Sequence, residues 1–440
     1  MLSSKELMRQ QIKSLVESHV TKREWNMGDW VQYAGPYFTD DEYVKSIECL
    51  LGGWLALGEN GLRFERKFKT WFDKNYGVLT NSGSSANLLM MSALKSKRLY
   101  DFKEGTKIIT PVAGFPTTVN PIIQNGYVPV FVDIELDTLN LNVEQLEDAA
   151  KTGAKAITFA HVLGNPPNMD RVMEVVRDYD LILLEDTCDA LGSKYDGKLL
   201  GSFGNFASCS FYPAHHITMG EGGFVACSTK EEEIIVKSLR EWGRGCYCSG
   251  KAAACLKNGM CGKRFSPWID SMPDTIFDHK FVYEEIGYNL KPMDMQAAMG
   301  LAQIEKIDEI ISLRKRNYKS YFKTFEKYEE FFHLPRPQHK SDPSWFAFPI
   351  TVRDTAPFDR KDFTMWLEEN KIQTRNYFAG NILLQPAYTH LYPEVDAKTK
   401  YPVATKVMMD TFFLGTSPVI CDRQTEYVCS VVDQFFKEKI

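Results

Sequence analysis

Long apolar runs are absent from this sequence. Nowhere do about 18 apolar residues follow one another, which is the length that a helix needs to cross a bilayer. Residues 1–20 carry charges throughout and lack the apolar core of a signal peptide. A basic surplus is absent too, because 52 Lys and Arg stand against 57 Asp and Glu, for a formal net charge of −5. We therefore expect a cytoplasmic protein that binds neither membrane nor nucleic acid.

Internal repeats, low-complexity tracts and dinucleotide fingerprints are also missing. No G-x-G-x-x-G stands between a strand and a helix, so the sequence gives no sign of a bound flavin or nicotinamide. What the chain does have is the balance of an ordinary soluble enzyme, with 44% apolar and 25% charged residues. Its 440 residues favour two or three structural units.

Short apolar runs alternate with helical patterns from about residue 107 to residue 228. The runs read KIITP, VPVFVDI, AKAITFAHV, LILLE, SCSF and GGFVACS, and several are too apolar for a sheet with one wet face. This alternation predicts a mostly parallel sheet with helices on both faces. A long helix is predicted from about Asp294 to Tyr328, and residues 331–440 mix strands with helices.

These patterns divide the chain into three parts. We expect residues 1–60 to contribute to a small domain and to the edge of the active site. Residues 61–315 would form the large cofactor-binding domain, including a cysteine-rich loop at 246–280 in which no regular period is seen. Residues 316–440 would form the small α+β domain.

A glycine- and serine-rich turn at 81–87, Asn-Ser-Gly-Ser-Ser-Ala-Asn, opens an apolar helical run. Glycine allows a close approach of the backbone, and the free N–H groups at the start of a helix attract anions. Gly83, Ser84 and Ser85 are therefore candidates for holding a phosphate. The same pattern is more often a plain helix cap, so this turn alone decides nothing.

Two further segments end apolar strands with polar side chains. In LILLEDTCDALGS the strand ends at Glu185 and Asp186, which places a carboxylate at the edge of the sheet where open α/β folds bind ligands. A carboxylate there suits a metal, a ribose or a protonated ring nitrogen. In SCSFYPAHHITMGEGG a strand leads into His215 and His216, and adjacent side chains point in different directions. At most one of these histidines therefore faces a given site.

Together these segments resemble the DegT/DnrJ/EryC1/StrS family of sugar aminotransferases, over most of the chain from Trp54 to Gln385. The resemblance implies an α/β, pyridoxal-phosphate-dependent aspartate aminotransferase-like (type I) fold, with a large mostly parallel-sheet domain and a smaller α+β domain. It also implies a homodimer with shared active sites. The positions that it implies for cofactor binding are Gly83, Ser84, Ser85 and Ser210 for the phosphate, Phe115 for stacking on the pyridine ring, Asp186 for the ring nitrogen, and Asn289 for the phosphate of the neighbouring subunit.

One position departs from the transaminases of that family. Where this sequence has His215, they carry the lysine that forms a Schiff base with the cofactor. An imidazole has no primary amine, so the cofactor would be held noncovalently as pyridoxamine phosphate. Although a lone histidine is more often a buried core residue, histidine moves protons near neutral pH, and we expect His215 to be the catalytic base. Asp189 lies in the ring neighbourhood and either supports that site or takes part in it.

Seven of the ten cysteines fall between Cys188 and Cys261, both included. In a cytoplasmic chain such a group indicates a metal centre or catalysis rather than disulfides, and four thiolates suit zinc or iron–sulfur equally. The resemblance narrows to the branch of the family that carries the histidine together with a 2Fe–2S cluster. It implies Cys188, Cys246, Cys248 and Cys261 as ligands, and an additional Cys255 competes with Cys261 for the fourth position.

That branch also implies a function. We expect C3 deoxygenation of a nucleotide-linked 4-keto-6-deoxy sugar, CDP-4-keto-6-deoxy-D-glucose, in the biosynthesis of O-antigen-type 3,6-dideoxyhexoses. Electrons would come from an NAD(P)H-dependent flavin or iron–sulfur reductase, and the sequence leaves CDP and TDP open. Three alternatives stand beside this function: a dehydrase that takes its amino group from glutamate and holds a structural zinc, a noncatalytic regulatory or structural protein, and a transaminase that uses another lysine.

Overall fold

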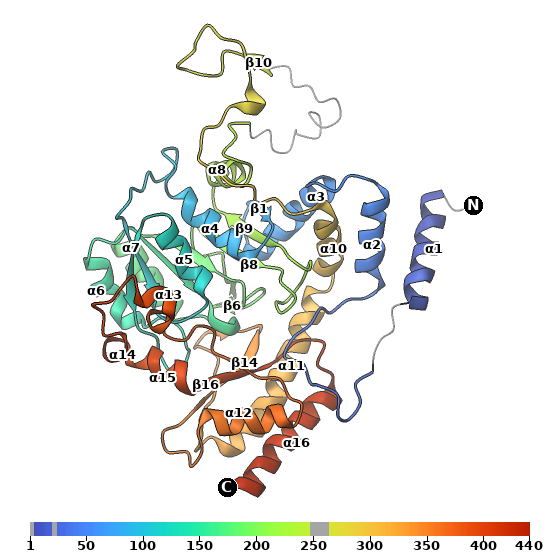
Figure 1. The fold of residues 1–440 in the computed structure, drawn as a ribbon, viewed down its shortest axis with the longest axis vertical. Helices are drawn as coiled ribbons and strands as arrows, with labels where there is room; N and C mark the ends of the chain where they lie inside the picture. The colour runs from blue at the N-terminus through green and yellow to red at the C-terminus, as the bar shows by residue number, and fades with distance from the viewer. Residues whose placement is uncertain (1–3, 20–23, 247–263) are drawn as a thin grey trace.

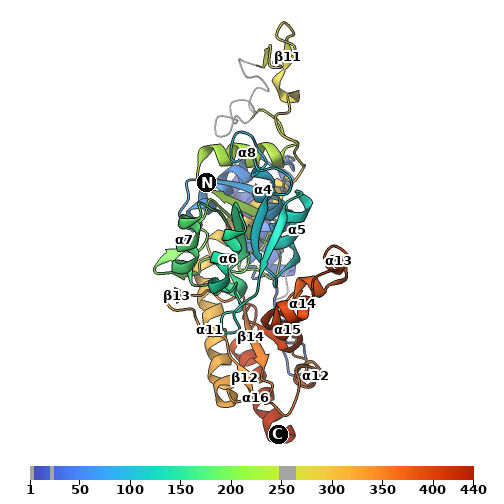
Figure 2. The ribbon, with the colours of Figure 1, turned by 90° about the vertical axis from the view of Figure 1, so that its left-hand side faces the viewer.

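The computed structural model describes residues 4–19, 24–246 and 264–440. It confirms the expected architecture, because a large sheet flanked by helices is followed by a smaller antiparallel sheet toward the C-terminus (Figures 1 and 2). Across these described ranges, no helix combines the length and the apolar character needed to pass through a membrane.

Seven strands form the large sheet, in the order β1-β9-β8-β5-β4-β2-β3. The strands from β8 to β3 are parallel to one another, whereas β9 is antiparallel to both of its neighbours. The apolar runs of the sequence overlap all of these strands except β1, which the pattern does not predict. The strands are β1 (Tyr76–Thr80), β2 (Lys107–Pro111), β3 (Val128–Val132), β4 (Ala156–Ala160), β5 (Ile182–Asp186), β8 (Phe206–Ser210) and β9 (Gly223–Cys227).

Helices cover both sides of this sheet, which explains why its strands are apolar on both faces. α4, α5 and α8 pack on one side. α6 and α7 pack on the other side, and α3 and α10 continue that layer near β1. These helices are α3 (Glu59–Phe68), α4 (Gly83–Ala93), α5 (Pro116–Gln124), α6 (Leu146–Lys151), α7 (Met169–Asp178), α8 (Lys230–Arg240) and α10 (Asp294–Ile304).

The C-terminal part is built on a four-stranded antiparallel sheet, β12-β14-β16-β15. α11, α12 and α16 pack against it in one apolar cluster. The first turn of α11 also belongs to the apolar cluster that contains residues of α3 and α10. This helix therefore links the large-sheet part to the C-terminal part (Figure 1). The elements are α11 (Ile307–Phe325), β12 (Phe332–His333), β14 (Ala347–Val352), α12 (Arg360–Glu369), β15 (Arg375–Asn376), α13 (Pro386–Thr389), α14 (Ala397–Lys400), α15 (Pro402–Asp410), β16 (Thr411–Gly415) and α16 (Asp422–Lys439).

The single long helix predicted for 294–328 is wrong, because two helices, α10 and α11, occupy that stretch. Lys306 lies between them with φ −112° and ψ 3°, which is outside helical geometry. Its ammonium pairs with the buried carboxylate of Glu42, which also accepts a hydrogen bond from Gln303 at the end of α10. Apolar spacing does not reveal this break, because a contact with a distant helix fixes it.

Shorter elements surround the two sheets. α1 (Ser4–His19) packs on α2 (Asp40–Leu51), and α2 covers α10. The hairpin of β10 (Phe265–Ser266) and β11 (Phe277–Asp278) projects beyond α8 in both views (Figures 1 and 2). A small sheet joins β6 (Lys194–Tyr195), β7 (Lys198–Leu199) and β13 (Ser341–Asp342). We keep 1–60, 61–315 and 316–440 as proposed domain limits.

Candidate active site

Asp186 ends β5 and lies buried at the carboxyl edge of the large sheet. Its Oδ2 accepts hydrogen bonds from Asn87 Nδ2 and Thr118 Oγ1, both at 2.8 Å. Its Oδ1 accepts from the N–H of Cys188 at 3.1 Å and from Ser208 Oγ at 3.3 Å. These donors come from α4, α5, β8 and the loop after β5, and together they hold the carboxylate in one orientation. A carboxylate held in this way suits a protonated ring nitrogen.

Gly83 begins α4 and lies against Ser210, the last residue of β8. A side chain at position 83 would place its Cβ 2.4 Å from Ser210 Cβ, so glycine is needed for this close approach. Ser82 caps the helix by accepting a hydrogen bond from the Ser85 N–H at 3.0 Å, and Ser84 is exposed beside it. The structure therefore brings Gly83, Ser84, Ser85 and Ser210 together at the start of an 11-residue helix. Helix N–H groups and hydroxyls at such a position suit a phosphate.

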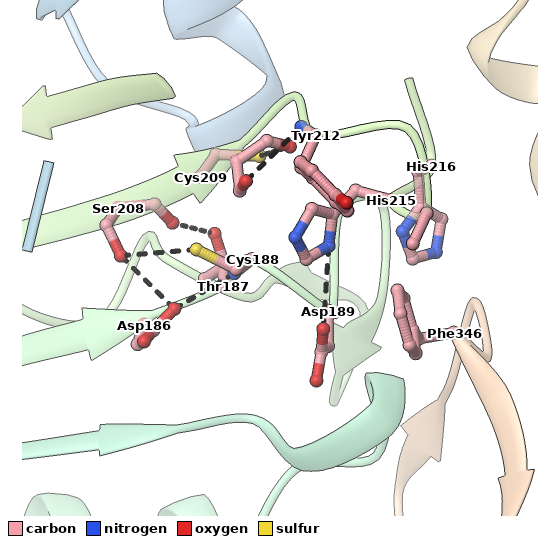
Figure 3. A network of polar contacts seen from close by, with 12 residues as sticks. Asp186, Thr187, Cys188, Asp189, Ser208, Cys209, Tyr212, His215, His216 and Phe346 are labelled. Carbon is pink, nitrogen blue, oxygen red and sulfur yellow. Dashed lines mark hydrogen bonds and ion pairs between the residues drawn. The ribbon is translucent and has the colours of Figure 1, made fainter. Parts of the chain in front are cut away.

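His215 and His216 follow β8 and point in different directions (Figure 3). His215 Nδ1 lies 3.5 Å from Asp189 Oδ1, and its ring packs against Phe346 with a centroid distance of 5.3 Å. His216 is buried, with Nε2 2.8 Å from Ser344 Oγ. Figure 3 shows His215 next to Asp189 near the end of β5, whereas His216 is turned away from that edge.

Burial shifts the pKa of His215 and that of the neighbouring Asp189. It lowers the pKa of His215 to about 4, with the nearby Arg314 adding to the effect. The imidazole is therefore neutral near pH 7 and able to accept a proton. Burial, together with the charge of Asp186, raises the pKa of Asp189 to about 7. Within the described ranges, no lysine forms a hydrogen bond or ion pair with any of these side chains.

Phe115 and Asn289 lie at the margin of this region. Phe115 precedes α5, its side chain is 51% exposed, and its ring meets Phe378 edge-on at 5.8 Å. Asn289 Oδ1 accepts a hydrogen bond from Lys291 Nζ at 2.7 Å. The next residue, Leu290, accepts from the N–H of Asn81 at 2.9 Å, so this segment lies beside the start of the glycine- and serine-rich turn. The roles assigned to Phe115 and Asn289 stay predictions.

The cysteines have separate surroundings in the described residues. Cys188 Sγ is 4.0 Å from Ser208 Oγ, and burial raises the pKa of its thiol well above the usual range. Cys246 is half-buried, with Sγ 3.9 Å from His279 Nε2. Three other candidate ligands lie outside the described residues: Cys248, Cys255 and Cys261. Within the described ranges no three His, Cys, Asp or Glu side chains are grouped to hold a metal, and the 2Fe–2S ligand set stays a prediction.

Several contact residues of this region were not singled out from the sequence. Asn87 has a sequence signal, because it lies four residues after Gly83 and therefore on the same face of α4. Thr118 lies three residues after Phe115 in PVAGFPTT. Arg314 lies four residues after Ile310, on the apolar face of α11, where a charged residue is unexpected.

Residues 37–433 match the DegT/DnrJ/EryC1/StrS aminotransferase family. The chain belongs to this family. It is 44% identical over 398 residues to the lipopolysaccharide biosynthesis protein RfbH of Salmonella typhimurium, covering 90% of this chain and 89% of that protein. It is 40% identical to the dTDP-4-dehydro-2,6-dideoxy-D-glucose 3-dehydratase of Saccharopolyspora spinosa, covering 92% of this chain and 86% of the relative.

Solved structures of proteins similar to this chain have the same fold. The GDP-4-keto-6-deoxy-D-mannose-3-dehydratase of E. coli with bound hydrated PLP has a TM-score of 0.78 and 27% identity, covering 92% of this chain and 99% of that one. A structure of the enzyme named GDP-4-keto-6-deoxymannose-3-dehydratase, with a trapped PLP-glutamate geminal diamine, also has a TM-score of 0.78 and 27% identity, covering 91% and 99%. The type I, aspartate aminotransferase-like fold expected from the sequence is thus confirmed.

The residues at the carboxyl edge of the large sheet fit pyridoxal phosphate or pyridoxamine phosphate as a ligand. A side chain at position 83 would clash with Ser210, so glycine brings the start of α4 close to the Ser210 hydroxyl, and helix N–H groups with hydroxyls suit a phosphate. The oriented carboxylate of Asp186 fits the ring nitrogen, and the amide oxygen of Asn87 is buried without a protein partner in the described chain. A polar ligand at this edge would account for that oxygen.

Proposed function

We propose that this chain is an enzyme that uses pyridoxamine phosphate and a 2Fe–2S cluster to remove the C3 hydroxyl of a nucleotide-linked 4-keto-6-deoxy sugar. We take CDP-4-keto-6-deoxy-D-glucose as the substrate, in the biosynthesis of 3,6-dideoxyhexoses for lipopolysaccharide. One observation carries the proposal. A neutral imidazole, that of His215, lies 3.5 Å from Asp189 at the position that resembles the lysine of the family's transaminases.

Each residue of the site has a separate role in this reaction. When bound, pyridoxamine phosphate supplies a primary amine for the 4-keto group and a ring that accepts electrons. Asp186 holds a proton on the ring nitrogen, because a buried carboxylate favours the charged form of a neighbouring base. His215 would accept a proton from the amine-bearing carbon of the bound cofactor, and the C3 hydroxyl would leave with a proton as water. Gly83, Ser210 and the helix start between them hold the phosphate.

Names of relatives support this class of reaction. Two of the proteins similar to this chain are named 3-dehydratases of nucleotide-linked keto sugars, and another is named for lipopolysaccharide biosynthesis. The choice of a CDP-linked sugar rests on sequence alone. Cys188 in EDTCDALGS and Cys261 before GKRF resemble the branch that carries a cluster.

Replacing the C3 hydroxyl by hydrogen needs an external reductant, since it consumes two electrons and two protons and releases water. The chain has no fingerprint for a flavin or a nicotinamide. An NAD(P)H-dependent flavin or iron–sulfur reductase would dock transiently near the loop from Cys246 to Cys261, through a small interface typical of redox encounters. A 2Fe–2S cluster would supply one-electron transfer. The ligands that we propose for it are Cys188, Cys246, Cys248 and Cys261.

We also propose that the enzyme is a cytoplasmic homodimer with shared active sites. In this assembly Asn289 of one subunit reaches the cofactor phosphate of the other.

A second candidate is a dehydrase that takes its amino group from glutamate and finishes by hydrolysis, with a structural zinc held by the cysteines. The similar 3-dehydratase with a trapped PLP-glutamate geminal diamine favours it. Both candidates use His215 in the same way, and they differ in how the reaction is completed.

Oxygen exchange separates the two. Purified protein given the keto sugar and pyridoxamine phosphate in labelled water, without reductase, should exchange the C3 oxygen and accumulate no 3-deoxy sugar. Reductase with NADH should then start net deoxygenation. Complete 3-deoxygenation with glutamate alone would exclude the reductase-dependent reaction and favour the glutamate-dependent dehydrase that finishes by hydrolysis. Absence of both exchange and turnover, with the His215→Asn variant as the blank, would exclude both.

Iron analysis of protein purified without air tests the cluster separately. We expect the Cys188→Ser, Cys246→Ser and Cys261→Ser variants to lose iron, as should the variant at Cys248. Cys255→Ser should keep its iron, as should Cys421→Ser, a control at an exposed cysteine on the C-terminal part. Iron loss in Cys255→Ser with retention in Cys261→Ser would mean that Cys255, and not Cys261, is the fourth cluster ligand. Zinc in place of iron would favour the second candidate.

A further inference from the structure

Arg314 is a charged side chain in the interior of the protein. It extends from α11, is 1% exposed, and forms no ion pair with a carboxylate in the described part of the chain. Burial lowers the pKa of Arg314 to about 9, so the guanidinium is still charged at neutral pH. A buried charge without a charged partner is costly unless hydrogen bonds compensate for it.

The guanidinium is compensated by backbone carbonyls from two segments of the chain. Nη2 donates to the carbonyl oxygens of Ala214 at 3.1 Å and His215 at 2.9 Å. Nη1 donates to the carbonyl oxygen of Phe346 at 2.9 Å. One side chain therefore holds the backbone of His215 and the backbone of the aromatic residue that packs against the His215 ring.

Beyond a backbone hydrogen bond at Cys188, the imidazole has little to orient it in the described residues. Its Nδ1 is 3.5 Å from Asp189 Oδ1, which is longer than a normal hydrogen bond. The direction of the ring therefore depends on the backbone conformation at His215 and on the position of the Phe346 ring, and Arg314 fixes both. The planar fork of a guanidinium can donate to three carbonyls at once, whereas an ammonium cannot reproduce that geometry.

We propose that Arg314 is a positioning residue that aims the His215 imidazole at the reacting carbon by holding the backbone of Ala214, His215 and Phe346. This inference deepens the proposed function and rests on His215 being its base. Because α11 links the large sheet to the C-terminal sheet, Arg314 also ties the base to a residue from the C-terminal part of the molecule.

The test uses the full-length chain loaded with pyridoxamine phosphate. Arg314→Lys keeps the charge but loses the fork, and Arg314→Met loses both. Arg316→Met is the matched control, since Arg316 lies on the same helix but bonds the carbonyl of Ile420 and the carboxylate of Asp422. We measure the melting temperature, cofactor affinity, and kcat and KM for C3 oxygen exchange. We also measure the rate at which diethyl pyrocarbonate modifies His215 relative to the exposed His390.

Arg314→Lys should bind cofactor and melt within a few degrees of wild type, while kcat falls about 100-fold with little change in KM, as expected for a misplaced catalytic group. Modification of His215 should become faster, and Arg316→Met should behave like wild type. Wild-type kcat in Arg314→Lys would overturn the proposal. So would a fall in kcat that is fully explained by lost cofactor or lost fold, which would leave Arg314 a structural residue.

Failure of the proposed function itself would look different. Wild-type protein would then neither exchange oxygen nor turn over the keto sugar, while the modification rates would still report on the His215 ring. Unchanged modification of His215 in Arg314→Lys overturns the positioning role in that case. If Arg314→Met fails to fold, the lysine variant alone decides.

Discussion

The interior of this protein and its candidate site each contain a pair made of one acidic side chain and one histidine, and the two pairs are neighbours in sequence. Glu185 and His216 face the interior and are 0% and 2% exposed. Asp186 and His215 stand next to them in sequence but face the edge of the sheet (Figure 3). Glu185 and Asp186 are adjacent residues of β5 and therefore point to opposite faces of the sheet, whereas the two histidines diverge in the bend after β8.

The interior pair bonds to surrounding loops, although Nδ1 of the buried His216 has no partner in the described residues. Glu185 Oε2 accepts hydrogen bonds from His161 Nε2 and the Gly201 N–H, both at 2.9 Å, and Oε1 accepts from the Gly204 N–H at 2.7 Å. His216 Nε2 is bonded to a serine hydroxyl that continues into a further serine and a backbone carbonyl. Both side chains therefore hold surrounding loops in place.

The pair at the sheet edge lies where a ligand would bind, and its carboxylate also has protein partners. Asp186 accepts four hydrogen bonds, from Asn87, Thr118, Cys188 and Ser208. The Nδ1 atom of His215 lies 3.5 Å from Asp189 Oδ1. The difference teaches that burial alone does not mark a site in this fold. The two pairs differ in position instead, because the second pair lies at the carboxyl edge of the sheet, where open α/β folds bind ligands.

His215→Asn should have the largest effect. We expect turnover to fall by about 10² to 10⁴, the usual contribution of a general base. Pyridoxamine phosphate should still bind, because the contacts to the phosphate and the ring nitrogen remain. Turnover by steady-state kinetics and cofactor content by absorbance check both parts, and near-normal turnover would remove His215 from the chemistry.

Asp186→Asn should follow closely. An amide does not keep the ring nitrogen charged, and loss of one partner of a buried ion pair costs about 3 kcal/mol. That cost corresponds to about a hundredfold in rate. The variant should keep the fold, since an amide has the same shape and can still accept from Asn87 or Thr118. Kinetics together with circular dichroism would show whether a folded variant retains wild-type turnover, which would contradict the role of Asp186.

His216→Asn should disturb stability rather than chemistry. The shorter amide leaves the Ser344 hydroxyl without its partner, which costs about 1 to 3 kcal/mol in the free energy of unfolding. Turnover by folded protein should stay close to wild type. His216→Gln is the matched control, because its amide nitrogen can take the place of Nε2. If His216→Asn proves more damaging to turnover than His215→Asn, the two histidines exchange roles.

Local patterns predicted the parts of this protein that depend on neighbours in sequence. β2 coincides with the run KIITP, and the apolar runs overlap the strands that end at Asp186 and Ser210. The family resemblance, rather than spacing, supplied the expected role of His215. The patterns predict these strands because apolar strand residues are set by the local chain, and the role of His215 stays a prediction.

Contacts between distant segments could not be read in this way. Asn87 and Thr118 meet at Asp186 although they lie 99 and 68 residues away from it in sequence, and Arg314 lies 99 residues from His215. The break before α11 depends on Glu42 in the same manner. Such contacts arise only when the chain folds, and no periodicity encodes them.

Glu185→Gln should have the smallest effect on turnover and a measurable one on stability. Burial alone would raise the pKa of Glu185, but the hydrogen bonds from His161 and the amides of Gly204 and Gly201 outweigh it and lower that pKa. A carboxylate with a lowered pKa stabilises the folded protein above the pKa of the unfolded chain, about 4.3 for glutamate. That stabilisation is lost as the pH falls through the lower pKa of the folded state.

The free energy of unfolding of Glu185→Gln should therefore be lower than that of wild type at neutral pH, by about 1 to 3 kcal/mol for a weakened buried hydrogen-bond set. The gap should narrow as the pH falls below about 4.3, since wild type then loses the contribution that the variant lacks. Urea unfolding at several pH values measures both curves. A gap that stays constant with pH would mean that the shape rather than the charge of Glu185 holds the 201–204 turn.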